Sequence, residues 1–111
     1  MEKMTLLDTR MIMEEIDPDF LDLVTQFMDS SRDVRDAAEL IDGDPIKKEM
    51  VKEVLKDFDE SYARSEAVRL LVEQDYSANR EFVLSELREI IKINNRIATK
   101  IRNKLVSIVW N

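Results

Sequence analysis

The residues best suited to chemistry are carboxylates that cluster in three parts of the chain. The three groups are Glu86 with Glu89, then Asp29, Asp33, Asp36 and Glu39, and finally Asp57, Asp59 and Glu60. Converging carboxylates can hold Mg²⁺ and activate a water molecule for hydrolysis. Runs of charge are more often solvated helix faces. The sequence therefore favours solvated faces and predicts no metal site and no catalytic residue.

One pair of these carboxylates resembles a known enzyme motif. Glu86-x-x-Glu89 is similar to half of the paired E-x-x-E and E-x-x-D motif of all-α nucleotide pyrophosphohydrolases of the MazG type. The resemblance implies a Mg²⁺-dependent hydrolase of nucleotides. No E-x-x-D follows Glu89, so the second half of the motif is missing. An alternative function is therefore that of a Mg²⁺-dependent nucleotide pyrophosphohydrolase.

Histidine and cysteine are both absent from the 111 residues. Their absence removes the commonest general base, the thiolate nucleophile and the commonest transition-metal ligands. The single glycine also leaves no glycine-rich loop for a phosphate group. We therefore expect a protein without enzymatic activity and without a cofactor.

Five basic residues recur every four positions and would line one edge of a helix. We call them the basic ridge: Arg88, Lys92, Arg96, Lys100 and Lys104. Residues 77–111 hold 7 Lys or Arg and 3 Asp or Glu, whereas residues 1–76 hold 10 and 21. The ridge would pair with acidic neighbouring helices or bind an acidic surface of a protein partner. A net charge of −7 and the lack of interleaved aromatic residues argue against nucleic acid.

A broad apolar stripe accompanies the ridge. One of its columns, with residues seven apart, is Leu87, Asn94, Ile101 and Ile108. Such a stripe predicts a helix that packs on two sides, as in a bundle. Asn94 would fix register or oligomeric state by meeting its twin, or would bond to water or a neighbour at the stripe's edge. With Asn94, we expect Ile101 and the terminal Trp110 to contribute to contacts between copies, although Trp110 could instead cover the end of the bundle.

Capping residues divide the chain into helices. Asp17-Pro18 and Asp44-Pro45 each combine an N-cap with proline at the first helical position, and Gly43 suits a helix end. The apolar pattern weakens around Asp59–Ser61, where a break is open. The predicted helices span about residues 4–15, 18–42, 45–74 and 77–110. Their short connections predict one all-α domain over residues 1–111, an antiparallel up-and-down bundle of one short and three long helices.

Two segments resemble the helical domain of GINS replication-complex subunits. Glu15-Ile16-Asp17-Pro18-Asp19-Phe20 is similar to that family's acidic, proline-containing turn, and residues 87–105 with Arg96 and Lys100-Ile101 are similar to its basic, apolar late helix. The resemblance implies a replication or nucleic-acid accessory factor. Leu21 stands where the family usually has a second aromatic residue, and the family's small β-domain does not follow.

Taken together, these patterns favour a non-enzymatic interaction, scaffold or regulatory module that acts through helix–helix docking. Its expected partner is a protein, most simply a second copy of the chain. No apolar run approaches the ~20 residues that span a bilayer, and no basic stretch precedes an apolar run at the N-terminus. We therefore expect a cytoplasmic protein that does not contact membranes.

Overall fold

The computed structural model describes residues 17–110, and the side chains of residues 17–106. Its elements are α2 (Pro18–Glu39), α3 (Pro45–Met50), the short 3-10 helix η1 (Lys52–Val54) and α4 (Leu55–Trp110). No strand occurs among residues 17–110, so the all-α prediction is confirmed there. The helix predicted at 4–15 lies outside the described residues.

The predicted caps begin α2 and α3. The Asp17 carboxylate accepts a hydrogen bond from the Phe20 amide at 3.2 Å, and the Asp44 carboxylate accepts from the Ile46 and Lys47 amides at 3.0 and 3.2 Å. These bonds satisfy amide groups that have no partner within a first helical turn. Helix α2 ends at Glu39, three residues before the predicted end, and Gly43 then adopts φ +76°. A positive φ is the backbone conformation that favours glycine.

A single helix over residues 45–74 is wrong. α3 ends at Met50, η1 follows, and α4 begins only at Leu55. The physical reason lies in Val51 and Val54, which are 2% and 0% exposed in the core. A 3-10 turn has three residues per turn, so it directs side chains three apart to the same side. The chain is helical through Asp59–Ser61, so the weakened apolar pattern there does not break the helix.

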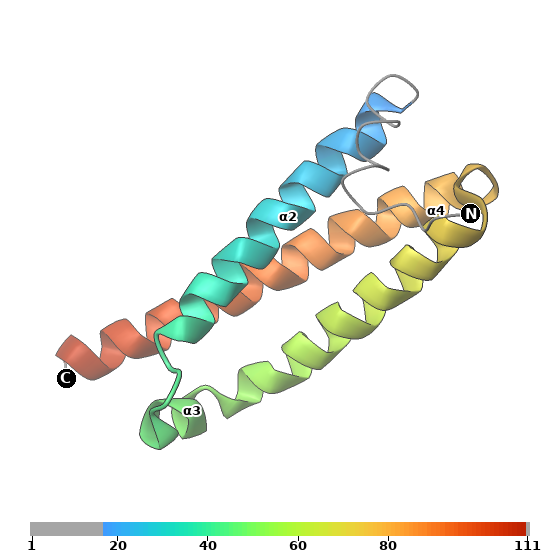
Figure 1. Cartoon of the computed structure of the whole chain (residues 1–111). Coiled ribbons are helices and arrows are strands. Elements are labelled where there is room, and N and C mark those ends of the chain that lie inside the picture. The colour runs from blue at the N-terminus through green and yellow to red at the C-terminus, as the bar shows by residue number, and fades with distance from the viewer. Residues whose placement is uncertain (1–16, 111) are drawn as a thin grey trace.

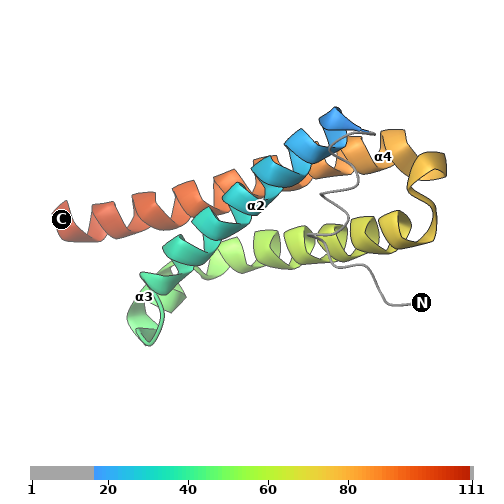
Figure 2. The ribbon, with the colours of Figure 1, turned by 45° about the horizontal axis from the view of Figure 1, so that its top comes forward.

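Helix α4 has 56 residues and folds back on itself at Asp75, whose φ of −162° and ψ of 89° are not helical. We call residues 55–74 its first arm and residues 76–110 its second arm. The two arms lie side by side and run in opposite directions, and α2 lies along the second arm (Figure 1, Figure 2). The Asp75 carboxylate accepts a hydrogen bond from the Ala78 amide at 3.1 Å, so Asp75 caps the second arm. Three separate long helices are therefore not confirmed, because one bent element replaces two of them.

The core consists of two apolar clusters that follow one another along the molecule. The first combines buried residues of α2 and both arms: Phe20, Leu23, Val24, Val68, Val83, Leu84, Leu87 and Ile90. The second lies toward α3: Ala37, Ile41, Val51, Val54, Ile93, Ile97, Ala98 and Ile101. The second arm supplies four of the eight buried residues in each cluster, and Leu87 and Ile101 of the predicted stripe are among them. No helix within residues 17–110 has the length and apolar character needed to cross a membrane.

Candidate functional site

The basic ridge is largely engaged by acidic groups of the same chain. Arg96 and Lys100 on the second arm contact the two carboxylate oxygens of Asp57 on the first arm, at 3.2 and 3.4 Å. Burial raises the pKa of Asp57, but hydrogen bonds and charge from Arg96 and Lys100 outweigh burial and leave the pKa below its ordinary value. This part of the ridge therefore holds the two arms of α4 together.

The other three residues of the basic ridge either form ion pairs or are exposed to solvent. Lys104 lies 3.6 Å from Glu53, and Lys92 lies 3.4 Å from Glu89. Arg88 is exposed and makes no ion pair within the described part of the chain. Outside the ridge, Arg102 reaches Asp33 of α2 at 2.6 Å, and this hydrogen bond raises the pKa of Arg102. The basic residues that face α2 and the first arm thus have intramolecular partners.

Asn94 lies at the centre of a buried polar layer between the two apolar clusters. Ser61 of the first arm donates to Asn94 Oδ1 at 2.5 Å, and Asn94 Nδ2 donates to Ser30 and Ser31 of α2 at 3.1 and 3.4 Å. Ser30 in turn donates to the Phe27 carbonyl at 2.8 Å. Among the described side chains, no buried polar atom lacks a partner. The amide thus connects three helical segments of one chain, whereas a contact with a twin Asn94 stays a prediction.

Ile101 and Trp110 were also predicted to contribute to contacts between copies. Ile101 is 0% exposed, inside the second cluster of this chain. Trp110 is the last residue of α4, and its side chain lies outside the described part. Ile101 therefore stabilises the chain's own core and offers no surface to a partner in this conformation.

A second buried polar group was missed by the sequence analysis. Asp17 bonds to the Tyr76 hydroxyl, and Arg80 Nε lies 2.8 Å from Asp17 Oδ2. The Arg80 hydrogen bond is the largest influence on Asp17 and helps to lower the pKa of this carboxyl to about 2, despite burial. The Phe20 and Tyr76 rings pack with centroids 4.6 Å apart. Together these contacts fix the start of α2 to the bend of α4.

The sequence identified Asp17 only as a cap. Its partners lie 59 and 63 residues further along the chain. Tyr76 and Arg80 follow the capping residue Asp75, and that position at a helix start was the only local signal. Pairing across such a distance requires knowledge of the fold.

The carboxylates of the enzyme-like motif do not converge on a shared site. Glu86 accepts two hydrogen bonds from Arg64, both at 3.1 Å, and Glu89 pairs with Lys92. Within the described residues no group of three Asp or Glu side chains is arranged to hold a metal ion. The geometry of Glu86 is that of an ion pair between the two arms of α4.

Large apolar side chains are exposed around α3. They lie at the end of α2, on α3 and at the start of α4: Leu40, Ile46, Met50 and Leu55 are 51, 74, 41 and 54% exposed. We call these four residues the α3-end surface. A shallow cavity of about 540 Å³ opens beside them, with Ile41, Val51, Leu55 and Phe58 in its lining. Large apolar side chains exposed at one end of a fold can mark a contact site.

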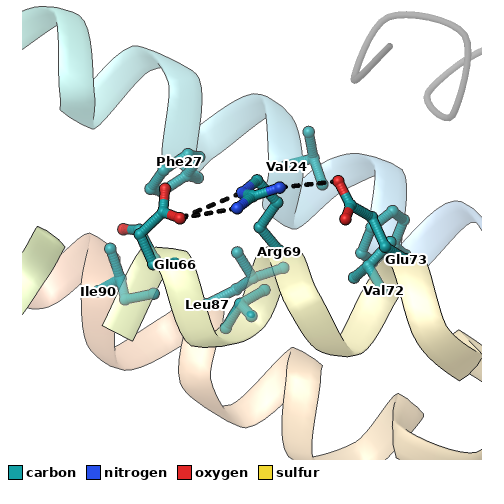
Figure 3. Close-up of a pocket in the computed structure, with 11 residues that line it drawn as sticks. Val24, Phe27, Glu66, Arg69, Val72, Glu73, Leu87 and Ile90 are labelled. Atoms are coloured by element: carbon teal, nitrogen blue, oxygen red, sulfur yellow. Dashed lines mark hydrogen bonds and ion pairs between the residues drawn. The ribbon is translucent and has the colours of Figure 1, made fainter. Parts of the chain in front are cut away.

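A second apolar cavity, of about 300 Å³, lies between α2 and residues 65–73 of the first arm. Val24 and Phe27 approach it from α2, Val72 from the first arm, and Leu87 and Ile90 from the second arm (Figure 3). Arg69 crosses its mouth, where it pairs with Glu66 and Glu73, both at 2.9 Å. We call this cavity the α2 groove.

Comparisons with known proteins found no matching family model, no matching curated protein and no matching solved structure. The likenesses to pyrophosphohydrolases and to GINS subunits therefore remain resemblances of short segments.

Proposed function

We propose that this chain is a non-enzymatic interaction module, and that two copies dock through the α3-end surface. The observation that carries this proposal is the exposure of four large apolar side chains around one short helix. Each side chain leaves much of its surface in water, which is unfavourable at roughly 25 cal/mol per Å² of apolar area. Covering them by a partner would remove this cost.

A second copy is the occupant that the chain itself suggests. The second arm extends past the end of α2 on the side where α3 lies (Figure 1, Figure 2). Val106 on this extension is 55% exposed, and Ile108, Val109 and Trp110 follow it in the sequence. In a two-fold dimer the extension of each copy would cover the α3-end surface of the other, because a two-fold contact presents the same patch from both sides.

The charged residues support a mainly apolar mode of docking. Most of the basic ridge contacts carboxylates of its own chain, so binding of an acidic partner there would compete with Asp57 and Glu53. Glu86, the first carboxylate of the hydrolase-like motif, pairs with Arg64 of the same chain. This ion pair does not support a hydrolase, and it does not support a nucleic-acid accessory factor. Neither of those alternatives gains a supporting contact, so helix–helix docking is the function that the geometry supports best.

Substitutions at the α3-end surface test this proposal. The variant with Leu40→Glu and Leu55→Glu places two charges on the surface at positions that are half exposed, so folding is expected to persist. Phe82→Glu is the matched control, since Phe82 is 54% exposed but lies near the bend of α4. Light scattering after size exclusion should give a dimer for the unmodified chain and for Phe82→Glu, and a monomer for the double variant. A double variant that remains dimeric would contradict the proposed surface.

A further inference from the structure

The α2 groove is an opening in the first apolar cluster. Phe20, Val24, Val68, Leu87 and Ile90 belong both to that cluster and to the lining of the groove. Phe27 and Val72, at its sides, are only partly buried. Protein interiors are close-packed, and an apolar cavity deprives its walls of contacts. An apolar segment that filled the groove would restore the missing contacts of its walls.

In the sequence, only Ile16 separates the helix predicted at residues 4–15 from Asp17. Asp17 is held at one end of the groove by Tyr76 and Arg80, and Phe20, three residues later, already lines the cavity. A helix of twelve residues, the length predicted for 4–15, is about 18 Å long. If it turned back at Asp17, it would run antiparallel to α2 and along the groove.

The sequence of this segment suits a helix placed between two walls. Leu6, Met13 and Ile16 are spaced by seven and three residues and share one face, while Met4, Leu7 and Met11 share another. A helix in a groove meets α2 on one side and the first arm on the other, so apolar residues on two faces are expected. Methionine fills irregular apolar gaps well because its side chain is unbranched and flexible.

We propose that residues 4–15 of the same chain occupy the α2 groove as a helix and complete the first apolar cluster. Counting back from Asp17 at 1.5 Å per residue places Met13 beside Val72, and Leu6 beside Ser65 at the far end. The tether favours this segment over that of another copy, because short connections give effective concentrations on the order of mM. The inference does not depend on association through the α3-end surface.

The absence of cysteine from the natural sequence makes a crosslinking test direct. The full-length double variant Leu6→Cys/Ser65→Cys would be treated with a short bismaleimide and resolved on a denaturing gel. Ser65→Cys is nearly isosteric, and circular dichroism checks that the helices persist. The matched control is Leu6→Cys/Glu89→Cys, in which the second cysteine lies at a half-exposed position of the second arm.

The expected result is a crosslink within one chain for Leu6→Cys/Ser65→Cys, at least tenfold faster than for the control and unchanged on dilution. Mass spectrometry of the digested monomer band would identify the joined peptides. Covalent dimers in place of the internal crosslink would show that another copy fills the groove, and would overturn the proposal. Equal rates in the two variants, or no crosslink in either, would overturn it as well.

Discussion

Arg80 and Asp17 are 63 residues apart in the sequence, yet Arg80 Nε lies 2.8 Å from a carboxylate oxygen of Asp17. Asp17 also caps α2 and accepts the Tyr76 hydroxyl. One buried carboxylate thus satisfies a helix start and an arginine beyond the bend of α4. Removing it would leave several polar groups without their partner, so its loss should cost more than the loss of an ordinary cap.

Asp17→Ala is therefore expected to lower the free energy of unfolding by about 3 kcal/mol, through the lost cap and the lost charged hydrogen bonds. The matched control is Asp44→Ala, which removes a cap whose only other contact among the described residues is a half-exposed ion pair with Lys47 at 3.9 Å. That control should cost about 1 kcal/mol or less. Urea unfolding followed by circular dichroism measures both values. Equal losses in the two variants would show that the contacts with Tyr76 and Arg80 contribute little.

The same carboxyl predicts a pH dependence of stability. Its pKa is about 2 in the folded chain against an ordinary value of 3.8, so the unfolded chain takes up the proton first as pH falls. The stabilisation is complete above about pH 4 and is lost as pH falls toward 2, and it amounts to about 2 kcal/mol. Asp17→Asn keeps a capping oxygen but cannot titrate. Between pH 5 and pH 2 it should lose less stability than the unmodified chain, by that amount.

The buried polar layer around Asn94 leads to a prediction about the stability of variants in that layer. Asn94→Ala is expected to cost about 2 kcal/mol, because the hydroxyls of Ser30 and Ser61 lose a buried partner. The triple variant Asn94→Leu, Ser30→Ala and Ser61→Ala removes both donors and acceptors and fills the space with an apolar side chain. It should be closer in stability to the unmodified chain than Asn94→Ala is. A triple variant less stable than Asn94→Ala would contradict this account of the layer.

The sequence predicted the helical fold class, the caps at Asp17 and Asp44 and the apolar stripe, because each depends on neighbouring residues. The break at Val51 was missed because it depends on where Val51 and Val54 meet the core, a tertiary effect that overrides local helix propensity. Asn94 was recognised as a polar residue within a stripe, but its partners Ser30 and Ser61 come from other helices. The sequence predicted that the basic ridge pairs with carboxylates of neighbouring helices, but it did not identify Asp57 as the partner of Arg96 and Lys100. Spacing along one helix does not show which carboxylate of another helix lies opposite.

Asp57 offers a test of the intramolecular account of the basic ridge. Asp57→Ala should lower the free energy of unfolding by about 1 kcal/mol, since Arg96 and Lys100 are half exposed and screened by water. The loss should shrink in 1 M salt, where screening weakens the pair in the unmodified chain too. Lys92→Ala, which removes a pair within one helix, serves as the control and should change stability by less than about 0.5 kcal/mol. Chemical unfolding at low and high salt distinguishes the two.

We propose that copies of the chain associate through apolar surface that the described fold leaves exposed. Sedimentation equilibrium of the unmodified full-length chain, over a range of concentrations, tests it most directly. We expect twice the chain mass of 13.1 kDa at micromolar concentrations, with dissociation on dilution. A mass of one chain that persists to high micromolar concentration would contradict it.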